Sequence, residues 1–292
     1  ETDLPVSQVY VDELKGLGAK LVTSSRWNNT VVLEVSDTLL MDEVAKKSFV
    51  RGVKKVWTQP DSIPPRNKKR GKEVTNDVKE SGHYYGKAFR QINIHGGDSL
   101  HAAGFTGKGM HVAVIDAGFY NADKINFFKH MDLLGTRDFV NPNSDIYEEN
   151  SHGMKVLSCM AANIKNVFIG TAPEASYWLL RSEDNDTEQP IEEDYWAAAI
   201  EFADSVGVDV INTSLGYYAF DEGYGGYRYR DLDGHYSLMS HSASVAADKG
   251  IVVVCSAGNS GRGAWKKITP PGDSENVLTV GALTKDLQNA EF

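Results

Sequence analysis

The chain has 292 residues, of which 41% are hydrophobic, and its 30 basic and 40 acidic side chains give a formal net charge of −10. This length and apolar content suffice for one large or two modest domains with a proper core. The negative charge argues against general nucleic-acid binding, and no apolar run approaches the roughly 20 residues that a membrane span requires.

The first 60 residues alternate between helical and strand patterns. Apolar spacing and turn signals predict, in order, a helix over 6–17, strands over 20–26 and 30–35, a helix over 39–47 and a third strand over 53–58. The two strands in the middle are joined by Asn28-Asn29, a hairpin turn signal. This order is that of a ferredoxin-like α+β unit without its first strand, so we predict a small domain over residues 1–60.

Residues 61–83 are predicted to form an exposed basic linker. Pro64 and Pro65 favour an extended backbone, and five basic side chains follow between residues 66 and 72, where they repel one another. A solvated charged loop and a site of proteolytic processing fit these residues equally well, so both interpretations stay open.

The second predicted unit, residues 84–292, contains a buried strand that ends in a carboxylate. Residues 111–115 are mostly apolar and lead into Asp116, which Ala117 and Gly118 follow. Open α/β sheets keep their ligands and chemistry at such strand tips, although an ordinary Asx turn explains the stretch equally well by itself. The nearby glycines precede the strand, whereas a phosphate-binding glycine loop follows one, which disfavours nucleotide binding.

Two later stretches supply further polar side chains. Apolar residues at helical spacing after His152 place this histidine in the first turn of a helix that packs on the sheet. Residues 250–256 are typical of another buried strand, which ends in the turn Gly258-Asn259. Each has a structural explanation when taken alone, because a lone histidine is usually solvated and a Gly-Asn pair usually makes a turn.

The rest of this unit is predicted to alternate strands and helices. The expected elements are strands over 175–180, 209–216 and 278–282 and helices over 195–206 and 237–249. Residues 182–194 hold seven acidic side chains and are predicted to be a solvated loop that enters a helix with an acidic first turn. Cys159 and Cys255 both fall in stretches predicted to be buried, and we interpret them as small hydrophobes instead of a pair.

A Tyr- and Gly-rich insertion is predicted over residues 217–236. Its Asp231-Leu232-Asp233-Gly234 resembles part of a calcium loop but lacks the spaced ligands of an EF-hand. We therefore assign no metal ligand, and calcium remains the alternative.

Taken together and in this order, the motifs resemble those of the subtilisin-like serine proteases. Val-Ile-Asp-Ala-Gly at 114–118 matches the aspartate signature of that family, and His152-Gly153 with its helix matches the histidine signature. Ser-Ala-Gly-Asn-Ser-Gly at 256–261 matches the turn of the oxyanion asparagine, and residues 209–216 look like the strand along which the family binds substrate.

The resemblance implies an incomplete subtilisin-like parallel sheet flanked by helices, preceded by an inhibitory prodomain that also assists folding. It implies that His152 is the general base, that Asp116 orients it, and that Asn259 stabilises the oxyanion. It implies a substrate pocket with two walls, formed by Ser214, Leu215 and Gly216 and by Ser256, Ala257 and Gly258. It implies no cofactor. The histidine motif departs from the family pattern, because Gly153-Met154-Lys155 replaces Gly-Thr-His, so we expect different hydrogen bonding at the helix start.

The family's serine signature, Gly-Thr-Ser-x-Ala, is absent from the 292 residues. We therefore expect a zymogen fragment whose nucleophile lies in a C-terminal remainder of the same polypeptide, held as a second chain, and whose substrates are proteins or peptides. No leader precedes Glu1, so a signal peptide is expected to have been removed, and the location is expected to be extracellular, periplasmic or at the cell surface. The alternative is a catalytically inactive relative that binds peptides or partners.

Overall fold

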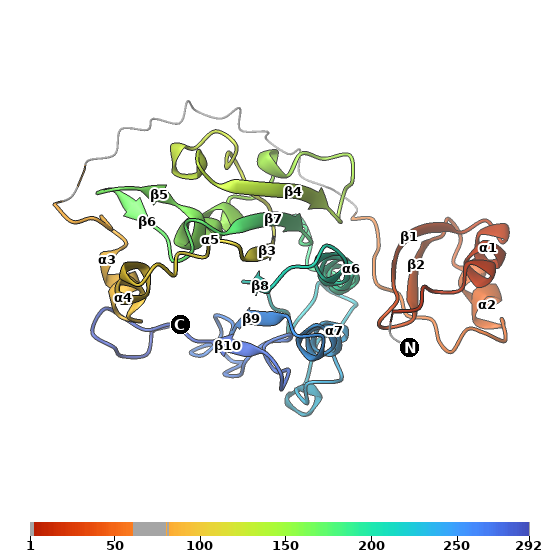
Figure 1. The fold of residues 1–292 in the computed structure, drawn as a ribbon. Helices are drawn as coiled ribbons and strands as arrows, with labels where there is room; N and C mark the ends of the chain where they lie inside the picture. The colour runs from red at the N-terminus through yellow and green to blue at the C-terminus, as the bar shows by residue number, and fades with distance from the viewer. Residues whose placement is uncertain (1–2, 61–79, 81, 292) are drawn as a thin grey trace.

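The computed structural model describes residues 3–60, 80 and 82–291. An N-terminal unit lies beside two helices of a larger α/β unit, and the larger unit carries a six-stranded sheet (Figure 1). The predicted basic linker over 61–83 lies almost entirely outside the described residues.

The N-terminal unit pairs a hairpin with two helices. Its elements are α1 (Gln8–Gly16), β1 (Lys20–Ser25), β2 (Thr30–Glu34) and α2 (Leu39–Ala45). The hairpin closes with Ser25 opposite Thr30, and Asn29 has a positive φ of 49°, a conformation that asparagine tolerates better than most residues. The predicted helices and hairpin are thereby confirmed.

The third strand predicted over residues 53–58 is wrong, because this segment pairs with no strand. Its backbone bonds to the larger unit instead. The Ile191 N–H donates to the Val56 carbonyl at 3.0 Å, and the Gln189 side chain bonds the Thr58 backbone. The backbone of the segment thus pairs with residues that lie 131 or more positions further along the chain, which local patterning does not indicate.

The six strands of the large sheet are all parallel and lie in the order β10-β9-β8-β3-β7-β4. They are β3 (His111–Asp116), β4 (Asp132–Asp138), β7 (Ser176–Arg181), β8 (Val210–Thr213), β9 (Val252–Ser256) and β10 (Leu278–Val280). The crossing helices are α5 (His152–Ala161), α6 (Ile191–Ser205) and α7 (Leu238–Asp248). Short elements complete the unit: α3 (Phe89–Asn93), α4 (Gly97–Ala102), the pair β5 (Asn163–Ile164) and β6 (Phe168–Ile169), and 3-10 turns at Asn126–Phe128, Ile146–Glu148 and Tyr229–Asp231. The predicted α/β fold with a parallel sheet flanked by helices is confirmed.

Helices cover both faces of this sheet. Along β3, Val112 and Val114 belong to a buried cluster with α5, whereas Ala113 and Ile115 belong to a second cluster with α6 and α7. The two sets alternate because successive strand side chains point to opposite faces. Burial on both sides explains why β3 is apolar at nearly every position instead of alternating.

The predicted acidic first turn of α6 is confirmed, but it is buried, so the predicted solvation is wrong for this part of residues 182–194, whereas the loop before it has exposed acids. The helix begins at Ile191, and Glu192, Glu193 and Asp194 in its first turn are all less than 10% exposed. Tyr217 and Tyr227 from the 217–236 insertion cover the turn and donate hydroxyl hydrogen bonds to Glu192 and Glu193. Burial raises the pKa of Glu192 to about 9 and that of Asp194 to about 7.

The two cysteines differ in their surroundings, and both are unpaired. Cys255 is buried in β9, as predicted, whereas Cys159 is exposed on α5, so its predicted burial is wrong. Within the described part of the chain, no helix combines the length and the apolar character that a membrane crossing demands.

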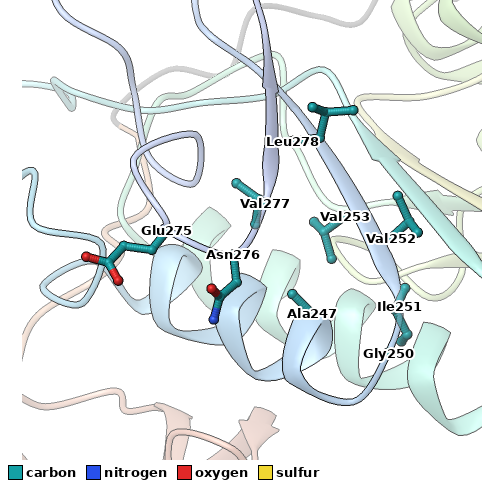
Figure 2. A pocket seen from close by; sticks show the side chains of 9 residues that line it. All are labelled: Ala247, Gly250, Ile251, Val252, Val253, Glu275, Asn276, Val277 and Leu278. Atoms are coloured by element: carbon teal, nitrogen blue, oxygen red, sulfur yellow. The ribbon is translucent and has the colours of Figure 1, made fainter.

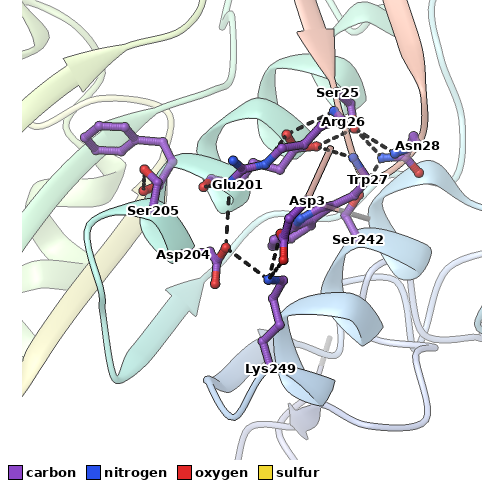
Figure 3. A network of polar contacts seen from close by, with 11 residues as sticks. Asp3, Ser25, Arg26, Trp27, Asn28, Glu201, Asp204, Ser205, Ser242 and Lys249 are labelled. Carbon is purple, nitrogen blue, oxygen red and sulfur yellow. Dashed lines mark hydrogen bonds and ion pairs between the residues drawn. The ribbon is translucent and has the colours of Figure 1, made fainter. Parts of the chain in front are cut away.

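The N-terminal unit docks on α6 and α7 through the turn of its hairpin (Figure 3). The Glu201 carboxylate on α6 accepts hydrogen bonds from the Ser25 hydroxyl and from the backbone N–H groups of Arg26 and Trp27, the latter two at 3.1 and 3.2 Å. Trp27 is 5% exposed and packs in the same cluster as the apolar faces of α6 and α7. One buried carboxylate therefore fixes the hairpin turn, and one aromatic ring fills the space beside it.

Candidate active site

The carboxyl ends of three neighbouring strands bring the predicted site residues to one edge of the sheet. β3 ends at Asp116, β8 leads into Ser214, Leu215 and Gly216, and β9 leads into Ser256, Ala257, Gly258 and Asn259. Because these strands are adjacent and parallel, their tips lie side by side. The site predicted from separate motifs is thus one region of the fold.

Asp116 and His152 form a hydrogen-bonded pair. His152 Nδ1 lies 2.8 Å from Asp116 Oδ1, Asp116 is fully buried, and the His152 side chain is 49% exposed. A neutral imidazole that donates from Nδ1 presents Nε2 as a basic nitrogen on its solvent side. The hydrogen bond to Asp116 raises the pKa of His152 above its usual value and outweighs the opposing effect of burial.

The start of α5 is positioned by its neighbours and not by a serine cap. The Asn150 side chain accepts a hydrogen bond from the His152 N–H at 2.7 Å, and Lys155 donates its backbone N–H to Ser151 as in a regular helix. The Lys155 side chain, at the departure from the family motif, is exposed. Asn150 thus holds the first turn of the helix, and the expected difference from the family's hydrogen bonding stays a prediction.

Gly153 allows α5 to touch the end of β3. A Cβ added at Gly153 would lie 2.6 Å from the Gly118 carbonyl oxygen and 2.8 Å from Asp116 Cβ. These contacts are far inside van der Waals distance, so the helix reaches the aspartate only because residue 153 has no side chain.

Gly153→Ala is expected to destabilise the chain by about 1–3 kcal/mol, the usual cost of overpacking a tight site. It should also lengthen the bond between His152 and Asp116, which NMR detects as loss of the downfield Nδ1 proton signal. The matched control is Gly16→Ala, because Gly16 closes α1 and has nothing within 4 Å of its added Cβ. Equal unfolding curves for the two variants would contradict this account of α5.

A buried arginine supports the loop that carries Asp116. Arg181, the last residue of β7, is fully buried, donates from Nε to the Ala117 carbonyl at 3.2 Å, and pairs with Asp138 at 2.9 Å. Ser182 donates its backbone N–H to the Asp116 carbonyl at 3.1 Å. Sequence reasoning missed Arg181, and the signal available was a cation at the end of an otherwise apolar strand.

Glu183 interacts electrostatically with Asp116 and His152. Burial, followed by the charge of Asp116, raises the pKa of Glu183 to about 7, and the Glu183 carboxylate in turn raises the pKa of His152. The sequence showed Glu183 only as one of seven acids in a loop. Its electrostatic effect on the histidine agrees with the parallel pairing of β7 with β3, which sets Arg181, two residues before Glu183, opposite Asp116.

The two predicted pocket walls, residues 214–216 and 256–258, both lie against Thr269. A Cβ added at Gly216 would lie 2.2 Å from Thr269 Oγ1, and one added at Gly258 would lie 2.9 Å from the same atom. Thr269 is 3% exposed, and nothing in its sequence context marked it for the site. The Leu215 side chain is buried in the core, so that residue offers only its backbone to a ligand, whereas Asn259 is exposed after β9.

The carboxylates of the suggested calcium loop accept hydrogen bonds from neighbouring groups of the chain. Asp231 accepts two hydrogen bonds from the Arg228 guanidinium at 2.9 and 3.0 Å, and Asp233 accepts the backbone N–H groups of His235 and Tyr236. Among residues 3–60, 80 and 82–291, no three His, Cys, Asp or Glu side chains are grouped to hold a metal ion.

A shallow cavity of about 460 Å³ lies at the opposite end of the sheet (Figure 2). It is lined by the end of α7 and the amino ends of β9 and β10, including Gly250, Ile251 and Val277. Asn259 follows the carboxyl end of β9, so this cavity is separate from the site around Asp116 and His152.

Comparison with known proteins matches both parts of the chain. Residues 107–292 match the Subtilase family, and residues 1–74 match the family described as "Peptidase S8 propeptide domain, Bacteroidota". Subtilisin DY from Bacillus licheniformis is 32% identical over 203 residues, which are 67% of this chain and 64% of that protein. Subtilisin E from Bacillus subtilis is 30% identical over 200 residues, which are 66% of this chain and 46% of that protein. The chain thus spans less than two thirds of the length of either relative.

Solved structures agree with the fold. MycP1 with its N-terminal propeptide removed is similar with a TM-score of 0.53 and 22% identity, over 73% of this chain and 67% of that one. At this identity the likeness concerns the fold alone. The family match over the sheet and its site, together with the propeptide match before it, shows that the chain belongs to the subtilase family and begins with a subtilase propeptide domain.

Proposed function

We propose that the complete protein is a serine endopeptidase, made as a zymogen, whose general base is His152. The observation that carries the proposal is the 2.8 Å bond between His152 Nδ1 and the buried Asp116, which lies at the carboxyl edge of the sheet within the residues that match the subtilase family. Asp116 fixes the tautomer of His152 and stabilises the imidazolium that forms when Nε2 takes up a proton.

The other roles are assigned on the same basis. The nucleophilic serine comes from a C-terminal remainder of the polypeptide, held as a second chain, and transfers its proton to His152 as it attacks the peptide carbonyl. The exposed side chain of Asn259 donates to the oxyanion that develops. Residues 214–216 and 256–258 form the walls beside the scissile bond, where the exposed backbone lets an extended peptide add as a strand. The reaction requires no cofactor.

The propeptide domain acts as an inhibitor and folding assistant. Its hairpin is held by Glu201, and its residues 56–58 bond to the start of α6, on the loop that leads from Glu183. A domain fixed at both points covers the approach to the cleft. Zymogen synthesis and protein substrates favour an extracellular, periplasmic or cell-surface location.

The test is active-site labelling of the full-length gene product with a fluorophosphonate probe, followed by intact mass measurement under denaturing conditions. We expect label on a species that contains sequence beyond residue 292 and none on a fragment that ends there. Absence of label on every species, with the chain folded, would support the inactive relative that binds peptides.

The acid limb of the pH profile provides a second check. Glu183→Gln removes a negative charge that raises the pKa of His152, so the base becomes neutral at a lower pH and the acid limb of kcat/KM should move to lower pH. The control is Glu222→Gln, which makes the same change at an exposed acid of the insertion and should leave the acid limb unchanged. A shift to higher pH, or the same shift in both variants, would contradict the placement of Glu183.

A further inference from the structure

Two loops near the catalytic pair form a basic surface on a chain that is acidic overall. They are residues 228–231 of the insertion and residues 260–268, which follow the asparagine turn, and together they are called the basic surface. Five of their side chains are basic and one is acidic, whereas the whole chain has 30 basic and 40 acidic side chains. Such a local excess of positive charge attracts groups of the opposite sign.

Aromatic side chains hold the two loops together. The Tyr229 hydroxyl donates to the Ala264 carbonyl at 3.2 Å and also bonds the Trp265 carbonyl. The Trp265 ring contacts the Tyr229 ring edge-on, with centroids 4.9 Å apart, and stacks on the Tyr218 ring at 4.8 Å. Trp265 is 8% exposed, and its indole N–H donates to the Ile268 carbonyl at 2.9 Å. The backbone that carries the cations is therefore fixed by packing.

The two arginines of the insertion share one carboxylate. Asp231 pairs with Arg228 at 2.9 Å, and the Arg230 guanidinium lies 3.8 Å from the same side chain. Asp231 is buried, whereas the side chains of Arg228 and Arg230 are 58% and 72% exposed. One positive charge therefore remains in excess at this point, and it faces solvent.

The two lysines of the other loop are exposed and adjacent. Within the described part of the chain, neither Lys266 nor Lys267 lies in an ion pair. The Lys267 ammonium lies 5.3 Å from the centre of the Tyr229 ring, which is itself half-exposed, so this pair lies at the surface. Lys266 has a positive φ of 54°, which few lysines adopt, and its N–H donates to the Ser260 carbonyl at 3.0 Å. The turn thus carries two neighbouring cations on a less favoured backbone.

The basic surface lies at the carboxyl edge of the sheet, where the catalytic pair also lies. Residues 260–268 connect Asn259 with Thr269, and Thr269 lies against both pocket walls. Tyr218, which belongs to the aromatic stack, follows Gly216 of one wall by two residues. A polypeptide bound between the walls therefore has its more distant parts within reach of these cations.

We propose that the basic surface is an exosite that binds an acidic segment of a protein substrate, outside the residues that occupy the cleft. Carboxylates complement the five cations, which the single acid of the surface balances only in part, and the exposed Tyr229 ring adds an apolar contact. The ligand is a polypeptide because the proposed reaction takes place at this edge of the sheet. The inference rests on the proposed peptidase function and adds to it a preference for substrates that carry Asp or Glu at a distance from the scissile bond.

The experiment uses the full-length protein after release of the propeptide. Internally quenched substrates share one cleavable core and carry a tail of six Glu or six Gln, joined through a Gly-Ser spacer to one end of the core or the other. At one of the two ends we expect the Glu tail to give a kcat/KM about 3- to 10-fold above that of the Gln tail, the effect of two or three exposed ion pairs. The advantage should appear in KM and should shrink as the salt concentration rises.

Two double variants test which cations are responsible. Lys266→Gln/Lys267→Gln should lower the Glu-to-Gln ratio of kcat/KM to less than about 2-fold. Lys108→Gln/Lys129→Gln makes the same change at exposed lysines that precede β3 and β4, at the opposite edge of the sheet, and should keep the ratio of the parent. Equal kcat/KM for the two tails at both ends, or the same loss in both double variants, with normal hydrolysis of the core, would overturn the exosite and leave the peptidase function intact.

A binding measurement separates the two proposals if no peptide is cleaved. Fluorescein-labelled hexaglutamate is titrated with the same protein at low salt, and its anisotropy is compared with that of labelled heparin, an anionic polysaccharide. We expect hexaglutamate to bind, and Lys266→Gln/Lys267→Gln to weaken its binding about 3- to 10-fold, whereas Lys108→Gln/Lys129→Gln should not. Binding of heparin without binding of hexaglutamate, or equal affinity for hexaglutamate in Lys266→Gln/Lys267→Gln and the parent, would overturn the exosite.

Discussion

Replacing Asp116 with asparagine is expected to lower kcat of the complete enzyme about 10⁴-fold while leaving the fold intact. An asparagine at this position can donate to His152 Nδ1, which favours the imidazole tautomer whose proton is on Nε2 and so removes the base. The bond concerned is the 2.8 Å contact to a fully buried carboxylate. Burst and steady-state kinetics on a peptide substrate provide the measurement.

The same substitution distinguishes the effect of Asp116 on the tautomer of His152 from its effect on the pKa of His152. Asp116 raises the pKa of His152, so Asp116→Asn should lower that pKa and increase the fraction of neutral histidine at pH 6–7. Activity should nevertheless fall, because the neutral histidine has the wrong tautomer. An NMR titration of His152 tests the pKa in this chain alone, and Asp132→Asn, which alters a carboxylate at the far end of β4, is the control. Loss of activity in proportion to a rise in the pKa of His152 would refute the tautomer argument.

Replacing Glu201 with alanine is expected to weaken propeptide binding by about 100-fold, equivalent to roughly 3 kcal/mol. The substitution removes a 7% exposed carboxylate that accepts hydrogen bonds from the Ser25 hydroxyl and from the Arg26 and Trp27 N–H groups (Figure 3). It leaves two backbone N–H groups in a buried interface without an acceptor, which is the costly way to break such a contact. The measurement is the inhibition constant of the propeptide added in trans to the mature enzyme.

Two controls bracket this effect. Asp204→Ala, on the same helix, removes ion pairs of 3.6 Å to Arg26 and 3.5 Å to Lys249 from a side chain that is 20% exposed, and we expect a loss of less than about tenfold. Glu13→Ala breaks only an exposed pair with Lys47 inside the propeptide and should have little effect. If the propeptide inhibits the Glu201→Ala enzyme no less tightly than the Asp204→Ala enzyme, the docking of the hairpin does not depend on the buried carboxylate.

The amino-acid sequence by itself determined the sheet and the identity of the central pair. A strand buried on both faces has to be apolar throughout, so residues 111–115 were visible as a strand without knowledge of their neighbours. The apolar run 251–255 was also visible as a strand, although one face of β9 is not fully buried and Val252 is 52% exposed. Asp116, His152 and Asn259 were visible because each ends or begins such an element within a motif of the family. The hairpin was visible because Asn28-Asn29 has local turn chemistry.

Only the tertiary structure decided which distant segments bury and hydrogen-bond one another. Residues 53–58 have a strand pattern, yet their backbone partners are Gln189 and Ile191, and the acids at the start of α6 are buried because tyrosines of the insertion cover them. Three further contacts likewise join residues far apart in the chain. Gly153 lets α5 approach β3, Thr269 lies against both predicted pocket walls, and Arg181 supports the loop after Asp116. Periodicity reports only which side of an element is apolar. Burial and hydrogen bonding of polar groups depend on the element packed opposite, which local sequence does not specify.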